Sequence, residues 1–199
     1  MWALVENSKV SKVFNRPTAI TINDTQYPAN IMGSWTAAQL KTIGIYEVVQ
    51  DGTNYKDPKY YNNTNQSFNF ASGTVTASYG TATALPLDDV LFTAQDETDG
   101  FGTEGEVKQK GIRQSHIDAI NAQAGGNLAP TDWMVVRAAE GGTAVPSSIT
   151  TQRAAVRTKA NAMCTQITNA ANVDALAALY VYNDETPAVR PLGELPTVG

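Results

Sequence analysis

The pattern of apolar residues changes near the middle of the chain, and this change constrains the fold most. Before residue 92, apolar residues come in short runs that alternate with polar ones, as in strands. After residue 104, alanine becomes frequent and apolar residues recur every three or four positions, as on one face of a helix. The sequence therefore predicts an α+β protein, with an N-terminal lobe rich in antiparallel β-hairpins and a C-terminal helical lobe.

We expect four segments along the chain. Residues 1–92 form a β-rich domain, and residues 93–103 form an acidic linker that contains glycine. Residues 104–182 form a helical domain, and residues 183–199 form an extended tail that contains proline. A chain of 199 residues is long enough to bury a core, either as one domain or as two small lobes.

Hairpin patterns stand out in the N-terminal half. Two short apolar runs within residues 2–14 are separated by Asn7-Ser8-Lys9 and predict an opening hairpin. Further on, Phe68 and Phe70 alternate with polar residues, Ser72-Gly73 forms a turn, and the return strand ends near Tyr79. The second pattern predicts a hairpin with one aromatic face.

A short helix is predicted near residues 36–43, because Thr36 and Gln39 have the spacing of a capping box. Gly44 stands where this helix would end. Trp35 precedes the helix and, like Trp2 and Trp133, lies at the edge of an apolar segment. We therefore expect the tryptophans to anchor a core rather than to form a platform for sugars.

Glycine pairs and prolines divide the helical half. Glu104 and Lys108 have the i,i+4 spacing that supports a helix, so a first helix is predicted from about residue 104 to Gly125-Gly126. A second, shorter helix is predicted from Pro130 to Gly141-Gly142. A third is predicted after Pro146, with a seam of apolar residues at seven-, four- and three-residue spacings: Ile149, Val156, Ala160, Met163 and Ile167.

Three arginines are the most suggestive charged residues of this half. Arg153 and Arg157 lie one turn apart on the third helix, and Arg137 lies on the second. They can pair with Asp132 or Glu140 and lock the helices together, or they can bind carboxylates of another protein. Both interpretations remain open at the level of sequence.

The residue types that carry most enzyme chemistry are scarce. His116 is the only histidine and lies on a predicted helix without a nucleophile motif. Cys164 is the only cysteine, which excludes an internal disulfide and a cysteine-rich metal cage. No glycine pattern matches a nucleotide-binding loop. We therefore expect no catalytic residue, no metal site and no cofactor.

The acidic loop at residues 95–106 leaves one weak possibility for calcium. Gly100 can be placed at the invariant sixth position of an EF-hand loop, which puts Glu106 at the twelfth. Gln95 and Gly102 then occupy positions that require a carboxylate and an apolar side chain. A flexible acidic turn is the better interpretation.

The net charge of −5 and the isoelectric point of about 4.8 oppose nucleic-acid binding. Residues 51–100 alone carry seven acids and two lysines, so this block has the net charge of the whole chain. No apolar run approaches the roughly 18 residues that a bilayer span needs, so we expect no membrane partner.

The C-terminal half contains the ordered pattern Thr131-Asp132-Trp133, Val136-Arg137, Glu140, Val145-Pro146, Arg153 and Val156-Arg157. This pattern resembles the C-terminal region of a family of tailed-bacteriophage proteins, of the marine phage type, which comprises tail-fibre assembly proteins and related small tail-associated structural proteins. The rest of the chain agrees at Tyr27-Pro28, Ser34-Trp35, Ile43 to Val49, the Phe68–Tyr79 hairpin with Pro86-Leu87, and Arg190 to Glu194.

This resemblance implies a structural role in the virion, in the tail, the baseplate or the attachment region of the tail fibre, after assembly in the host cytoplasm. The partners would be other phage structural proteins in a multi-copy assembly. A tail-fibre assembly chaperone absent from the mature particle, a capsid decoration protein and a carbohydrate-binding module remain alternatives. The residues that we expect to contact partners or to mark the structure are Trp35, Phe68, Phe70, Tyr79, Trp133, Arg137, Arg153 and Arg157.

Overall fold

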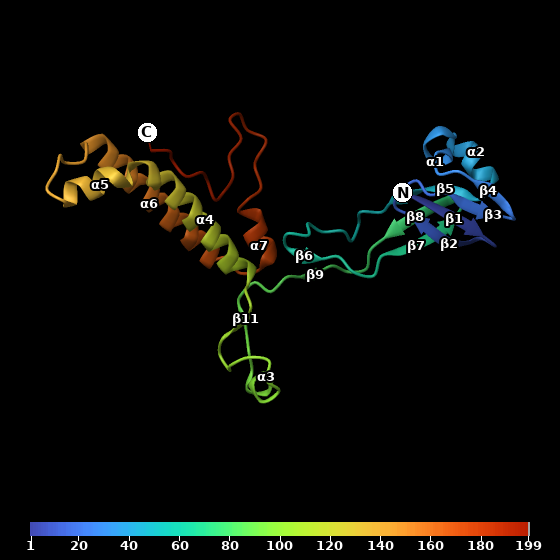
Figure 1. Cartoon of the computed structure of the whole chain (residues 1–199), viewed down its shortest axis with the longest axis horizontal. Helices are drawn as coiled ribbons and strands as arrows, with labels where there is room; N and C mark the ends of the chain where they lie inside the picture. Colours follow the sequence, from blue (N-terminus) through green and yellow to red (C-terminus); the bar gives the residue numbers. More distant parts are fainter. Residues whose placement is uncertain (199) are drawn as a thin grey trace. The chain divides into compact units, whose positions relative to one another are not determined.

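The computed structural model describes residues 1–198, which fall into two compact units, Met1–Thr83 and Ala84–Gly199. Strands make up the ordered elements of the first unit, apart from two short helices, and long helices dominate the second (Figure 1). The predicted α+β class, with hairpins before helices, is therefore confirmed. The boundary between the units falls after Thr83, earlier in the chain than the domain boundary after residue 92 that the sequence predicts.

The first unit is built on a five-stranded sheet with the strand order β2-β1-β5-β8-β7. Neighbouring strands are antiparallel except for β5 and β8, which are parallel. The bounds are β1 (Trp2–Glu6), β2 (Lys9–Phe14), β5 (Ile45–Gln50), β7 (Ser67–Ala71) and β8 (Thr74–Ser78). The outer strands β2 and β7 also contact each other, so the sheet curls.

Both predicted hairpins are present, and their turns explain why the sequence specifies them. Asn7 and Ser8 join β1 to β2 with φ values of 51° and 60°. Ser72 and Gly73 join β7 to β8 with φ values of 50° and 74°. Two consecutive residues with positive φ make the turn whose twist matches a two-residue hairpin.

Alternate side chains of the sheet point into two different cores. On one face, Leu4 and Ile45 pack beneath a cover of the short elements β3 (Ile20–Ile22), β4 (Thr25–Tyr27), α1 (Ile31–Ser34) and α2 (Ala37–Thr42). On the other face, Ala3, Val75 and Ala77 are completely buried inside the curl of the sheet. Strand periodicity therefore gives both faces apolar side chains to bury.

The predicted cap of the short helix is also present. The Thr36 side chain accepts from the Gln39 backbone N–H at 3.3 Å, and the Thr36 N–H donates to Gln39 Oε1 at 2.9 Å. Gly44 follows the helix with φ +81°, and a Cβ there would lie 3.0 Å from the Val5 carbonyl oxygen. Glycine is therefore required at this turn. Residues 51–66 hold one strand, the short β6 (Tyr61–Asn62), which pairs with β9 (Thr83–Ala84).

The second unit opens with an arm, residues 84–111, which contains β10 (Val90–Leu91), α3 (Ala94–Thr98) and β11 (Val107–Gln109). The segment expected to be a linker, residues 93–103, thus holds a capped helix, with Thr93 as its N-cap. The prediction of a helix from residue 104 is wrong, because β11 occupies this region and the first long helix begins only at Ile112. Lys108 pairs with Asp96 across the arm at 2.5 Å rather than with a residue one helical turn away.

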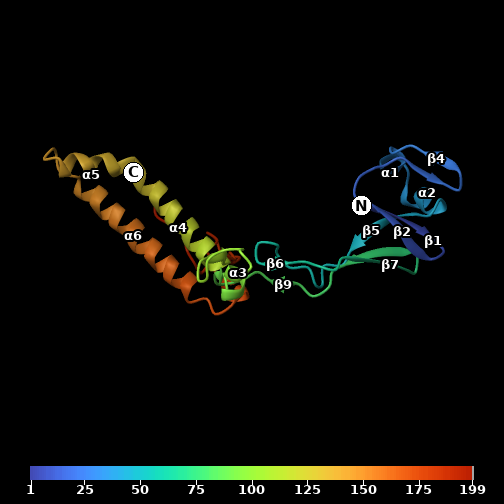
Figure 2. The same cartoon turned by 60° about the horizontal axis from the view of Figure 1, so that its bottom comes forward.

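The helices of the second unit form an antiparallel pair, α4 (Ile112–Leu128) and α6 (Ser147–Thr168), which lie side by side (Figures 1 and 2). A 3₁₀ turn (Ala129–Thr131), α5 (Asp132–Ala139) and an elbow connect them, and α7 (Val173–Ala178) follows. Helix α4 continues through Gly125-Gly126, contrary to the expected stop. The predicted seam is buried at Val156, Ala160, Met163 and Ile167, while Ile149 is partly exposed.

The end of the described chain packs onto these helices. Leu192 is completely buried and Leu195 is 9% exposed. Lys159 Nζ of α6 donates to the Leu192 carbonyl at 2.9 Å, and Asn127 Nδ2 of α4 donates to the Pro196 carbonyl at 3.0 Å. The tail predicted to be merely extended therefore contributes side chains to the helical core.

Candidate functional site

Arg153 holds together the corner where α4 ends and α5 begins. Its guanidinium Nη1 donates to the Leu128 carbonyl at 2.8 Å and to Thr131 Oγ1 at 2.6 Å, and its Nη2 donates to Asp132 Oδ1 at 2.7 Å. The Leu128 carbonyl belongs to the last turn of α4, where carbonyls lack helical partners. The interpretation of Arg153 as an internal ion-pair residue is therefore confirmed.

Trp133 lies on the surface, directly after this corner. Its side chain is 55% exposed, so the expectation that it anchors a core is wrong. The guanidinium carbon of Arg137, one turn along α5, lies 4.9 Å from the centroid of the Trp133 ring. This cation–π stack holds the indole in place without covering it.

Helix α5 as a whole presents apolar side chains to solvent. Val135 is 42% exposed and Val136 is 55% exposed, and no residue of α5 is buried. We call Trp133, Val136 and Arg137, which share one face of the helix, the α5 patch. An isolated helix of this length is marginal in water, so its order depends on the Arg153 corner and on the elbow that follows.

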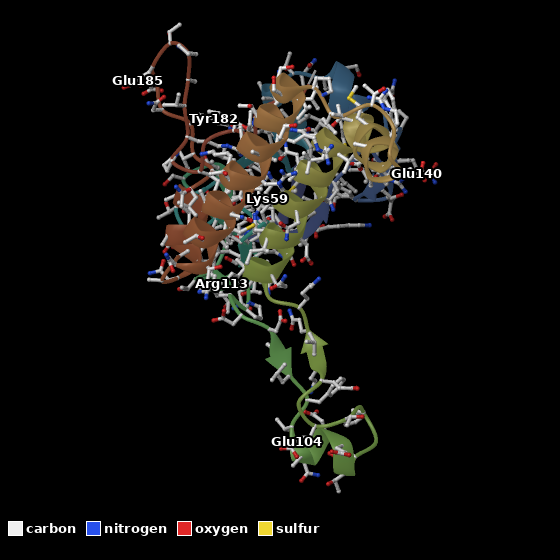
Figure 3. All side chains as sticks on the ribbon, turned by 90° about the vertical axis from the view of Figure 1, so that its left-hand side faces the viewer. Lys59, Glu104, Arg113, Glu140, Tyr182 and Glu185 are labelled. Atoms are coloured by element: carbon white, nitrogen blue, oxygen red, sulfur yellow. The ribbon has the colours of Figure 1, made fainter. Side chains whose placement is uncertain are left out.

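The elbow after α5 fixes the direction of Arg137. The Gly142 N–H donates to the Arg137 carbonyl at 3.0 Å, and Gly141 has φ +83°. A Cβ at Gly142 would lie 2.9 Å from both the Arg137 carbonyl oxygen and its Cγ. Arg137 Nε also donates to the Thr143 carbonyl at 3.2 Å. The two glycines allow the chain to turn tightly against Arg137. Figure 3 shows Glu140, directly before this elbow, pointing outward.

Arg157 is the one member of the predicted arginine set that the corner does not include. It lies one turn beyond Arg153 on α6, and its side chain is exposed. The structure therefore brings Arg153, Asp132, Trp133 and Arg137 together and leaves Arg157 as a separate surface charge.

The predicted aromatic residues of the first unit are mainly packed. Trp35 makes an edge contact with Tyr27 at 5.9 Å between ring centroids and packs against the first core. Phe70 contacts Tyr46 at 4.8 Å, and both Phe68 and Phe70 pack against the second core. Their positions favour a structural role.

Tyr79 belongs to a surface pocket that the sequence did not indicate. Its ring lies 5.3 Å from the ring of Tyr55, at an angle of 54°. The two rings, with Gln50 and Asp51, line a cavity of about 320 Å³. Hydrogen bonds from the Thr53 hydroxyl and backbone N–H lower the pKa of Asp51. Tyr55 lies in a polar loop, and no periodic pattern in the sequence marks it.

The scarce reactive residues take part in packing. His116 Nδ1 lies 2.7 Å from the Tyr180 hydroxyl oxygen, and the two rings are in contact. Cys164 is partly buried, and burial raises the pKa of its thiol. Among residues 1–198, no three histidine, cysteine or acidic side chains are grouped to hold a metal ion.

In the acidic loop at residues 95–106, carboxylates of the loop accept hydrogen bonds from backbone N–H groups of the same region. Asp96 Oδ2 accepts from the Thr93 N–H at 2.9 Å and caps α3, and Glu97 Oε2 accepts from the Glu104 N–H at 3.1 Å. The position assigned to Gln95 in the calcium hypothesis lies in α3. The local geometry is thus that of a capped helix.

Comparison of the chain with protein-family models, with curated proteins and with solved structures returned no match. In the part of the chain that the structure describes, no helix combines the length and the hydrophobicity that crossing a bilayer requires. The features of this molecule that bear on its function are therefore those of its own surface, and the α5 patch first.

Proposed function

We propose that this chain is a structural protein of a tailed-phage virion, located in the tail, the baseplate or the attachment region of the tail fibre, and acting through contacts with other proteins. The observation that carries the proposal is the exposed Trp133–Arg137 stack on α5. Tryptophan and arginine are the residue types most enriched among the dominant contacts of protein interfaces.

The surroundings of the stack support a role in binding. Val136, three residues from Trp133, extends the exposed apolar surface on the same face of this short helix. The Arg153 corner and the glycine elbow order this surface before any partner arrives, which lowers the entropic cost of binding. Because Trp133 is 55% exposed, a role in stability alone does not account for a tryptophan at this position.

The resemblance to phage proteins supports the same role. Its C-terminal pattern runs from Thr131 to Arg157, and this stretch contains the corner, the α5 patch and the elbow. Part of the resemblance therefore falls on the residues that build and present the exposed surface.

The test is peptide mass spectrometry of purified phage particles produced from the genome that encodes this chain. The expected result is that the chain is present in a fixed ratio to tail proteins. Absence from mature particles, with presence in infected cells, would instead indicate an assembly chaperone. A copy number in the hundreds, proportional to the capsid protein, would indicate capsid decoration.

A glycan array on the purified protein addresses the carbohydrate-binding alternative. The tilted Tyr55–Tyr79 pair is the surface that such binding would use. A silent array is expected under the structural role. A reproducible signal that Tyr55→Ala removes would favour the binding module.

A further inference from the structure

We propose that the arm, residues 84–111, is a second docking element that receives an extended basic segment of a partner protein. The segment would add to the open edge of the β10–β11 ladder and place apolar side chains against Leu91, Val107 and Phe101. The inference rests on the proposed role in assembly, and it assigns the partner's chemistry, which that role leaves open.

The arm is a narrow ladder with unpaired edges. Within residues 1–198, strands β10 and β11 pair only with each other, and the Phe92 N–H extends the ladder by donating to the Glu106 carbonyl at 2.9 Å. Both strands thus keep free backbone groups on their outer edges. Such edges accept an additional strand, and a lone two-stranded hairpin gains stability from one.

The arm is fastened firmly at its base. Arg113 Nη1 on α4 pairs with Asp88 at 3.1 Å, and Asp89 Oδ1 accepts from the Gly111 N–H at 2.7 Å. A Cβ at Gly111 would lie 2.4 Å from the Asp88 carbonyl carbon, so the two chain segments lie in direct contact. In Figure 3, Arg113 lies at this base and Glu104 lies near the far end of the arm.

The arm presents apolar side chains to solvent. Phe101 is 69% exposed, Val107 is 51% exposed and Leu91 is 46% exposed. Between residues 84 and 110, no residue is buried. Exposed apolar groups on a strand edge are an aggregation risk unless a partner covers them, so their presence favours a binding role.

Charge identifies the kind of partner. The arm has seven acids and two lysines, a net charge of −5, and the remaining 12 basic and 12 acidic residues of the chain cancel. Asp96 is engaged by Lys108, whereas Glu104 and Glu106, which follow the exposed Phe101 in the sequence, are themselves exposed. Two such arms would repel each other, so a second arm is disfavoured and a basic segment is favoured.

The test selects peptides from a random display library on the immobilised full-length protein, followed by affinity measurements in solution. The expected peptides alternate lysine or arginine with apolar residues, and their affinity falls as salt rises. Phe101→Ala is expected to weaken binding about thirtyfold, as for a dominant aromatic contact. Methylation of alternate peptide N–H groups on the edge-pairing side should abolish binding.

Charge variants test whether the peptides bind to the acidic residues of the arm or respond only to the negative charge of the whole chain. The double change Glu104→Gln and Glu106→Gln is expected to weaken binding about fivefold and to flatten its salt dependence. Asp184→Asn with Glu185→Gln removes the same charge from another exposed loop, and Val181→Ala truncates another exposed apolar residue of the same unit. Both controls should bind as the parent chain does.

Selected peptides without basic residues would overturn the inference. So would a library in which every selected peptide binds the arm variants as tightly as it binds the parent chain. Concentration-dependent dimerisation that Phe101→Ala removes would assign the arm to a second copy instead. Particle mass spectrometry remains a separate test, because a chain absent from virions can still bind through its arm. A chain present in virions without arm-dependent binding would refute this inference alone.

Discussion

Arg153 Nη2 lies 2.7 Å from Asp132 Oδ1, and Asp132 is the residue directly before the exposed Trp133. The ion pair connects a nearly buried guanidinium, with 10% of its side chain exposed, to a carboxylate that is 58% exposed. One arginine of α6 therefore determines where α5 begins and how its apolar residues face solvent. Stability at this corner and the geometry of the α5 patch are linked.

Replacing Arg153 with methionine should destabilise the helical unit. The change removes the donors to the Leu128 carbonyl and to the buried Thr131 hydroxyl, and we expect a loss of about 2 kcal/mol in the free energy of unfolding. Chemical denaturation followed by circular dichroism measures it. Arg157→Met, one turn along the same helix, should change the free energy by no more than about 0.5 kcal/mol. Equal losses in both variants would show that the hydrogen bonds of Arg153 do not stabilise the corner.

Replacing Trp133 with alanine should cost little stability. Trp133 is 55% exposed, so the expected loss is that of an exposed cation–π contact, about 0.5–1 kcal/mol. Leu176→Ala, at a completely buried position, should cost about 3 kcal/mol in the same thermal or denaturant unfolding experiment. A loss for Trp133→Ala as large as that for Leu176→Ala would restore the core role that the sequence suggested.

The elements that the sequence predicted are those whose causes are local. The turns at Asn7-Ser8 and Ser72-Gly73 need only residues that tolerate positive φ. The cap formed by Thr36 and Gln39 spans three residues, and the seam of α6 repeats within one helix. Each of these features is complete within a short window of sequence.

The elements that the sequence missed depend on contacts between distant residues. Lys108 pairs with Asp96, and this places a strand where i,i+4 charge spacing indicated a helix. Leu192 is buried because the tail returns to α6, which no local pattern encodes. The exposure of Trp133 also depends on distant parts of the chain, because the apolar character of a residue does not reveal whether another element covers its side chain.

The pairing of Asp96 with Lys108 should be visible as an acid titration. The hydrogen bond from Lys108, followed by those from Thr93, lowers the pKa of Asp96 from its ordinary value of 3.8 to about 2. Because the folded pKa is the lower one, the stabilisation is present above pH 3.8 and is lost as the pH falls through about 2. NMR titration of the Asp96 carboxyl carbon measures the midpoint.

Lys108→Met tests the cause of this shift. Removing the ammonium group should move the Asp96 midpoint upward, toward 3.8, while the Thr93 hydrogen bonds keep it somewhat below that value. Lys110→Met is the control, because Lys110 pairs with Asp118 instead. An unchanged Asp96 midpoint in Lys108→Met would show that the pair does not persist in solution.

Two glycine-to-alanine changes should have opposite signs. At Gly142 the new Cβ would lie 2.9 Å from the Arg137 carbonyl oxygen, so the elbow must shift, and we expect a loss of about 1–2 kcal/mol in the free energy of unfolding. At Gly126, inside α4, a Cβ meets nothing within 4 Å. Alanine is the better helix former there, so Gly126→Ala should gain about 0.4–1 kcal/mol.

The Gly142 change should also reach Trp133, because the elbow holds the Arg137 backbone and Arg137 stacks on the indole. In a background that carries Trp2→Phe and Trp35→Phe, Gly142→Ala should raise the quenching of Trp133 fluorescence by acrylamide, and Gly126→Ala should leave it unchanged. Quenching that is unaffected by Gly142→Ala, in a protein that has lost the expected stability, would separate the elbow from the stack. The glycine would then be required only for the turn, and the ordering of the α5 patch would depend on Arg153 alone.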